Sequence, residues 1–328
     1  MRASLENLCN KFISNRDTIK GVFKWENDQI IAASATTFLN RGMEADAAKL
    51  ETCKKVLKEN TGVFSNFRGN VEIPMVAQLA LADVPEDKMR KTLKIYDDLK
   101  QEFMGSEYLV LAAAVMADMV SEDQSVKMAE KARSIYNKMK KDHPFLTSGE
   151  DAVYAVLMSI SEKNDETLME EMEVCYKKLK ETFSASNEVQ ALAHVLSIAE
   201  GSAEEKCNKV VALFEALRDA GVKYGKYHEL VVLASLALLP VEKSVLVEEI
   251  EAVDAFLTEQ KGYGFFGLDK KTRLMHAAMI VSCDYVKNDN ADVAAMTGTL
   301  AAVAAQQAAM CAVIASSVAA SSAANAGN

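Results

Sequence analysis

The sequence predicts an all-α protein made of stacked antiparallel helical hairpins of about 40 residues, which form a curved α–α superhelix or solenoid-like array. Three observations support this fold class. Helix-favouring residues dominate the 328-residue chain, which contains only 4 Pro and 14 Gly. No window alternates apolar and polar positions with β-branched residues, as a half-buried strand would. A small-residue helix, a polar turn and an amphipathic helix follow one another about seven times along the chain.

The clearest copy of the repeat spans residues 106–149. Its first helix, over 109–119, is apolar nearly all round, so we expect it to be buried between neighbouring hairpins. In its second helix, over 126–139, apolar residues follow steps of three and four, and charged residues fill the opposite face. This pattern is typical of an amphipathic helix with one solvated side.

Aromatic residues mark the register of the repeat. Tyr96, Tyr136 and Tyr176 stand 40 residues apart in the second helices. Another aromatic stands about ten residues before an alanine inside each small-residue helix, and we expect it to plug the junction between successive hairpins. The members of this second series are Phe23, Phe67, Phe103, Phe145, Phe183, Tyr224 and Phe266.

In chain order, residues 1–22 form an N-terminal helix that is expected to cap the first hairpin. The predicted hairpins then cover residues 30–59, 73–102, 106–149, 151–183, 188–220 and 228–261, and a last repeat helix covers 272–285. Thr147 and Glu150 have capping-box spacing ahead of an apolar run and therefore predict the start of one helix. Residues 1–288 are thus expected to form one helical-hairpin repeat domain.

Residues 289–328 form a separate, Ala-rich segment with no charged residue from position 293 onward. Its larger apolar residues are spaced as one helical face: Leu300, Val303, Met310, Val313, Ile314 and Val318. Three interpretations remain open: a helix packed on the array or on a partner, a mostly disordered tail, or a membrane-associated helix over 293–320. The segment is long enough to span a bilayer. However, polar residues interrupt it and alanine contributes little transfer free energy, so membrane contact is the least favoured of the three.

Charge and cysteine content restrict partners and location. The formal net charge is −10, whereas binding of a phosphate backbone depends on clustered Lys and Arg, so no nucleic-acid partner is expected. The six cysteines form no CxxC pair, which favours buried thiols in a reducing compartment. The N-terminus lacks the apolar run of a signal peptide, and we therefore expect a cytoplasmic protein.

No catalytic, cofactor or metal motif is recognisable. P-loop, dinucleotide, HExxH, nucleophile-elbow and EF-hand patterns are all missing from the sequence, so we predict no cofactor, no metal and no catalytic residue. The glycine-rich stretch 262–267, GYGFFG, lacks the spacing of a phosphate-binding loop and is expected to be a tightly turned or flexible junction. His194 and His276 lie inside small-residue helices, where a hydrogen-bonded, semi-buried histidine is expected.

The least ordinary charges are Arg68 and Arg273, each at the start of a small-residue helix, where the helix dipole disfavours a cation. An anionic group from the protein or from a ligand would compensate for this. Other residues at the hairpin junctions complete a candidate binding surface, whose members are Arg68, His143, Thr147, Tyr263, Arg273 and His276.

Hairpin arrays offer long binding surfaces, so the leading hypothesis is a protein-binding or scaffolding module whose partner is another protein. The second hypothesis is an enzyme in which the hairpins close into an α/α toroid, with two carboxylates converging on a central cleft. The third is a structural protein that self-assembles into oligomers through its uncharged tail.

Three stretches resemble a bacterial family of unknown function, domain of unknown function 4003. They are HPFLTSGEDAVYAV at 143–156, FRGNVEIPMVAQLALAD at 67–83, and GYGFFG at 262–267 with RLMHAA at 273–278. The resemblance covers most of residues 5–288. It implies an all-helical cytoplasmic protein and no established activity, cofactor or catalytic residue.

Overall fold

The computed structural model describes residues 1–24, 26–184, 186–264 and 267–288. This part of the chain contains fourteen α-helices, two short 3₁₀ turns and no strand. The prediction of an all-α fold is therefore confirmed.

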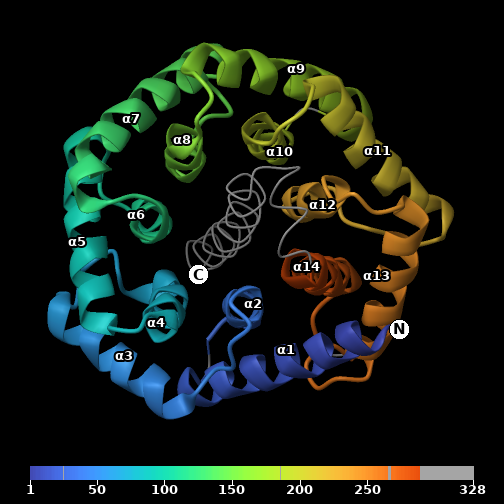
Figure 1. Cartoon of the computed structure of the whole chain (residues 1–328), viewed down its shortest axis with the longest axis horizontal. Helices are drawn as coiled ribbons and strands as arrows, with labels where there is room; N and C mark the ends of the chain where they lie inside the picture. Colours follow the sequence, from blue (N-terminus) through green and yellow to red (C-terminus); the bar gives the residue numbers. More distant parts are fainter. Residues whose placement is uncertain (25, 185, 265–266, 289–328) are drawn as a thin grey trace, which may run out of the picture.

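The helices form two concentric rings (Figure 1). The outer ring consists of α1 (Ala3–Val22), α3 (Ala47–Asn60), α5 (Pro85–Glu102), α7 (Ser125–Asp142), α9 (Asp165–Phe183), α11 (Ala203–Asp219) and α13 (Lys243–Thr258). The inner ring consists of α2 (Asp28–Asn40), α4 (Glu72–Leu81), α6 (Glu107–Met119), α8 (Asp151–Ile160), α10 (Asn187–Ile198), α12 (Glu229–Ala237) and α14 (Lys270–Asn288). The 3₁₀ turns η1 (Gly69–Val71) and η2 (Glu122–Gln124) precede α4 and α7.

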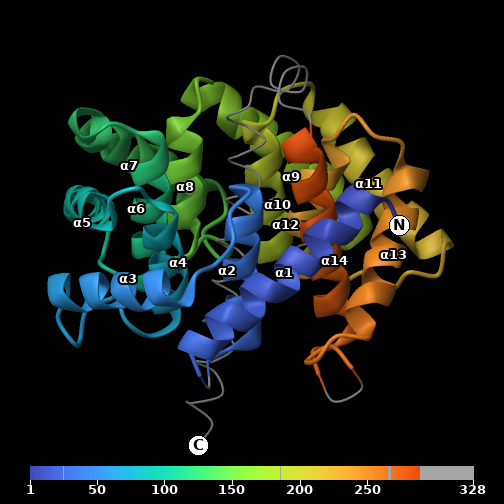
Figure 2. The ribbon, with the colours of Figure 1, turned by 60° about the horizontal axis from the view of Figure 1, so that its bottom comes forward.

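The ring closes where the two ends of the described chain meet (Figure 2). The last inner helix, α14, packs against both α1 and α2. Polar contacts reinforce this junction: the Arg2 guanidinium lies 2.8 Å from Oδ2 of Asp284, and the Ser4 hydroxyl donates to the same oxygen over 3.2 Å. The sequence predicted a curved array, and these contacts turn the curve into a closed ring.

Each inner helix lies beside the outer helix that precedes it in the chain, most extensively in the α9–α10, α7–α8 and α5–α6 pairs. The helix over residues 1–22, which was expected to cap the first hairpin, is therefore the outer helix of the first pair. The sequence period is the same whichever helix is taken as the start of the unit. This is why the repeat was visible in the sequence while the pairing of its helices was not.

The outer helices are amphipathic because they separate the inner ring from solvent. In α7, for example, Ala129, Ala132, Ile135 and Met139 are buried at helical spacing, whereas the opposite face is exposed and rich in Lys. Inner helices have no such solvated face, and long runs of consecutive residues within them are buried.

Side-chain caps fix where many helices begin. Ser106, Ser186 and Ser202 each accept a hydrogen bond from a backbone N–H in the first turn of α6, α10 and α11. The capping box predicted for α8 does not form. Instead, the backbone N–H of Ser148 donates to Oδ2 of Asp151 over 2.7 Å, and no side chain caps the helix.

Edge-to-face aromatic pairs link successive outer helices. Their ring centroids are separated by 5.0 Å in Phe67–Tyr96, 5.6 Å in Phe103–Tyr136, 4.6 Å in His143–Tyr176 and 5.0 Å in Phe183–Phe214. The predicted junction aromatics Phe23 and Tyr224 are buried as well. Phe145 is the exception and the prediction for it is wrong, because its side chain is 98% exposed. His143, which is half-buried, occupies the junction position in its place.

The five described cysteines are all buried thiols that form no disulfide among the described residues, as predicted: Cys9, Cys53, Cys175, Cys207 and Cys283. No helix of the described chain combines the length and the apolar character needed to cross a membrane. Phe266 and the alternatives considered for residues 289–328 lie outside the described residues.

Candidate functional site

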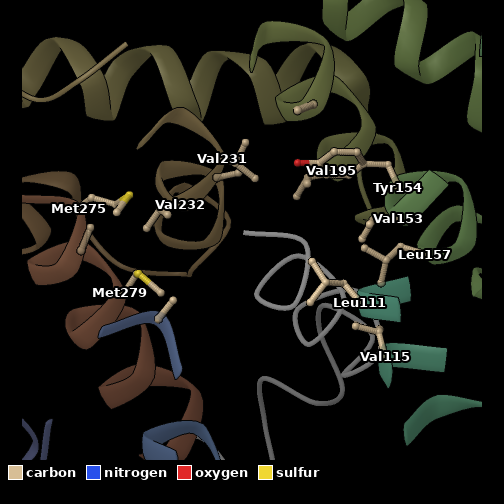
Figure 3. Packing of buried hydrophobic residues seen from close by; sticks show 14 of the residues in the cluster. Leu111, Val115, Val153, Tyr154, Leu157, Val195, Val231, Val232, Met275 and Met279 are labelled. Carbon is tan, nitrogen blue, oxygen red and sulfur yellow. The ribbon is translucent and has the colours of Figure 1, made fainter. Parts of the chain in front are cut away.

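The inner surface of the ring is uncharged over most of its length. Each inner helix overlaps an uninterrupted stretch of ten or more residues without Asp, Glu, Lys or Arg, and some of these stretches continue into the following turn; they are 29–40, 73–82, 108–117, 152–161, 189–199, 230–241 and 274–283. Figure 3 shows Leu111 and Val115 of α6 and Met279 of α14 pointing toward the middle of the ring. The wall is therefore suited to apolar rather than to ionic contacts.

One buried polar cluster lies between α8 and α10. His194 is fully buried, with Nδ1 3.7 Å from Oδ1 of Asp151 and with the ring of Tyr154 5.4 Å away between centroids. Neither ring nitrogen of His194 has a hydrogen-bond partner among the described residues. The prediction of a hydrogen-bonded histidine is therefore wrong at this position.

Burial raises the pKa of Asp151 and lowers the pKa of His194. Desolvation raises the pKa of Asp151 to about 7, against the hydrogen bond from Ser148, which lowers it. Desolvation, together with the charge of His143, lowers the pKa of His194 to about 3. At neutral pH the histidine is neutral and the carboxyl group lies near its titration midpoint, where a group can both release and accept a proton.

Thr147 and Gln190 extend the cluster toward the α7–α8 loop. The Gln190 side-chain amide donates to Oγ1 of Thr147 over 3.1 Å, and both residues are buried. Oε1 of Gln190 has no partner among the described residues. Thr147, predicted at a junction surface, therefore lies inside the protein and holds α10 to the loop before α8.

Three of the other predicted residues meet at the closure of the ring. The Tyr263 hydroxyl and Nδ1 of His276 form a hydrogen bond of 2.7 Å, and both side chains are fully buried. Arg273 forms an ion pair with Asp254, with Nε 2.7 Å from Oδ1, and donates from Nη1 to the Tyr263 carbonyl over 3.2 Å. The expected compensating anion for Arg273 is thus Asp254 of α13.

Glycine geometry places Tyr263 in this position. Gly262 has φ +90°, which favours glycine. A Cβ on Gly267 would lie 2.1 Å from the Gly262 carbonyl oxygen. The close approach of these two backbone segments therefore requires glycine at position 267. The Leu268 N–H donates to that same oxygen over 2.8 Å and closes the loop. The described part of this junction is tightly turned, one of the two forms predicted for it.

The remaining two candidates lie elsewhere on the ring. Arg68 donates to the carbonyls of Lys58 and Thr61 over 3.2 and 3.1 Å at the end of α3, and Nη1 lies 3.8 Å from Glu72. His143 places Nε2 2.8 Å from Glu173 of α9. His143 shares the α7–α8 loop with Thr147, whose backbone N–H donates to the His143 carbonyl over 3.0 Å. The six predicted residues therefore form three separate groups rather than one continuous surface.

Sequence reasoning passed over Asp151, Gln190 and the buried Arg16. Asp151 stands in the first turn of α8 and Gln190 in the first turn of α10, and no sequence motif connects the two. No group of three or more His, Cys, Asp or Glu that could hold a metal ion occurs among the described residues.

Comparisons with known proteins identify a family and a relative of this chain, and neither has a described activity. The chain is 23% identical over 326 residues to "Uncharacterized protein YeaA" of Bacillus subtilis (strain 168), and the alignment covers 97% of each chain. No solved structure matches it. A family model matches residues 15–309, and the chain therefore belongs to the family described as "Protein of unknown function (DUF4003)".

Proposed function

We propose that the protein is a binding module that takes up an uncharged, apolar polypeptide segment of another protein against the inner surface of its ring. The observation that carries this proposal is the uncharged stretch in each inner helix, together with the inward direction of Leu111, Val115 and Met279. Apolar side chains gain about 25 cal/mol per Å² when they are removed from water, so such a wall favours a matching apolar segment.

A charged substrate would find little compensation on this wall. Removing a charge from water is costly unless an opposite charge is present. Two buried carboxylates of the inner ring are also engaged locally: Asp284 with Arg2 and Ser4, and Glu229 with the backbone N–H of Tyr227 over 2.9 Å. These contacts favour binding over paired-carboxylate catalysis.

Cross-linking from the inner wall tests the proposal. A diazirine analogue of leucine placed at Leu111 in the full chain would be activated in cells, and its products identified by mass spectrometry. The same analogue at Val126, which is 52% exposed on α7, is the matched control. The expected result is a product with a second polypeptide that forms at position 111 and not at 126.

Two other results would contradict a partner-binding module. Products confined to residues 293–328 of the same chain would mean that the uncharged tail, whose composition also suits the wall, is the segment bound. Equal labelling of the same polypeptide from both positions would mean that the contact is not specific to the inner wall.

A second candidate function is catalysis in the closed ring. The observation in its favour is the raised pKa of Asp151, about 7, beside the unpartnered His194. Screening the full chain and Asp151→Asn against pooled ester, glycoside and phosphoester substrates tests this. Turnover that is lost in the variant would support an enzyme, and equal turnover in both would exclude Asp151 from the reaction.

Self-assembly through the tail is the third candidate. Light scattering on the full chain and on a chain ending at Asn288 tests it directly. Oligomers formed only by the full chain would support it, and monomers in both cases would exclude it.

A further inference from the structure

A pocket of about 530 Å³ lies beside the closure of the ring, away from the inner wall. The last turns of α1, the start of α2 and the loop between α13 and α14 line it, with the side chains of Arg16, Lys20, Lys24, Lys261, Asp17 and Asp28 among its residues. Four cations and two carboxylates give the lining a formal charge of +2, in a chain whose net charge is −10. The pocket thus has the charge opposite to that of the chain as a whole.

The two carboxylates are already used by two of the cations. Oδ1 of Asp17 accepts from both Nε and Nη2 of Arg16, over 2.9 and 2.7 Å. Asp28 forms an ion pair with Lys20. Lys24 and Lys261 have no carboxylate within ion-pair distance in the described part of the chain, so the excess positive charge resides on these two side chains.

Arg16 is built into the pocket rather than projecting from it. Arg16 is only 8% exposed, and its guanidinium lies 5.3 Å from the centroid of the Tyr263 ring. Tyr263 is in turn fixed by its hydrogen bond to His276. The orientation of the guanidinium is therefore set before any ligand arrives, which limits the entropy lost on binding.

The helix dipole does not account for this arrangement. A lysine in the last turn of α1 is favoured by the negative end of that helix, and this explains Lys20. Lys261 comes from the loop after α13, and Arg16 lies more than one turn before the end of α1. Cations from two separate segments therefore converge on one pocket.

We propose that this pocket binds a small molecule that carries a phosphate group. The planar guanidinium of Arg16 matches the geometry of phosphate oxygens, and the ammonium groups of Lys24 and Lys261 neutralise a dianion. The volume falls within the range of about 300–1,000 Å³ that is usual for small-molecule sites. This site is independent of the proposed function, because it lies outside the inner wall of the ring.

Isothermal titration of the full chain with pyrophosphate tests the proposal at low ionic strength. Lys24→Gln combined with Lys261→Gln is expected to weaken binding at least tenfold. The matched control is Lys127→Gln combined with Lys141→Gln, two exposed lysines of α7 on another part of the ring, and it is expected to leave binding unchanged. Equal loss in both double variants, or unchanged affinity in the first, would overturn the assignment.

Two further measurements distinguish a phosphate site from loss of folding and from nonspecific attraction of anions. Asp17→Asn releases Arg16 from its carboxylate and is expected to tighten pyrophosphate binding, a gain that unfolding cannot produce; unchanged or weaker binding would exclude Arg16 from the site. Citrate at the same ionic strength is expected to bind at least tenfold more weakly than pyrophosphate. Equal affinity for citrate would overturn the assignment to phosphate.

Discussion

The hydroxyl of Tyr263 lies 2.7 Å from Nδ1 of His276, and this hydrogen bond joins the α13–α14 loop to the last inner helix inside a fully buried site. Nε2 of His276 has no partner among the described residues. Burial, with a contribution from the nearby Arg16 charge, lowers the pKa of His276 to about 3 and keeps the ring neutral. Within the described part of the chain, Tyr263 is therefore the one hydrogen-bonding partner of this imidazole, at the place where the ring closes.

Tyr263→Phe is expected to lower the free energy of unfolding by about 1–3 kcal/mol, because it leaves a buried imidazole nitrogen unsatisfied. Urea denaturation followed by circular dichroism measures this. Tyr227→Phe is the matched control, since Tyr227 is 59% exposed and its change should stay within about 0.5 kcal/mol. Equal effects of the two changes would show that the hydrogen bond does not stabilise the closure.

Asp151→Asn is expected to become more stable relative to the wild type as the pH rises. The pKa of Asp151 is about 7 in the folded chain, against a reference of 3.8. Between these values the folded state holds a proton that the unfolded state has released, so wild-type stability falls as the pH increases. The amide of asparagine does not titrate, so the variant lacks this pH dependence. The dependence amounts to about 1.4 kcal/mol in the free energy of unfolding for each unit of pKa shift. Urea midpoints measured from pH 4 to pH 8 test this, and parallel pH profiles would contradict it.

His194→Gln is expected to give the opposite slope. Its pKa is lowered from 6.5 to about 3, so the unfolded state binds a proton in this range that the folded state does not. Wild-type stability is therefore lost as the pH falls from about 6.5 toward 3. The variant should gain stability relative to the wild type at pH 4 and not at pH 7, measured by the same urea titrations. Slopes of the same sign for His194→Gln and Asp151→Asn would contradict one of the two assignments.

Much of the fold could be predicted because it depends on local pattern. The spacing of 40 between Tyr96, Tyr136 and Tyr176 is a spacing between outer helices, and each outer helix shows its buried stripe in its own sequence. A repeat of this kind defines the angle between neighbours only loosely. Closure depends on contacts such as that of Arg2 with Asp284, residues that no periodicity connects.

The candidate sites were less predictable for the same reason. Asp151 and His194 come from two different inner helices, and their approach to 3.7 Å follows from helix packing rather than from a motif. Arg16 and Lys261 are separated by most of the chain and meet only because the ring closes. Tyr263 and His276 could be singled out because both belong to one loop–helix junction.

The spacing of the repeat identifies His143, rather than Phe145, as the aromatic at its junction. Phe103, His143 and Phe183 are 40 residues apart, and each ring packs edge-to-face against an aromatic of the next outer helix. Phe145 matches Phe103 and Phe183 in residue type, but only His143 matches them in spacing. The register of the repeat places residue 143 at the junction and leaves residue 145 in solvent.

Three variants test this register. His143→Ala is expected to lower the free energy of unfolding by about 1–3 kcal/mol, because it removes the contact with Tyr176 and the hydrogen bond to Glu173. Phe145→Ala should stay within about 0.5 kcal/mol, since this side chain is 98% exposed. His143→Phe restores the ring that Phe103 and Phe183 supply at equivalent positions, and it should recover more than half of the loss seen with alanine. Urea denaturation of all three against the wild type measures these differences. If Phe145→Ala cost more than His143→Ala, position 145 rather than 143 would be the structural member of the aromatic series.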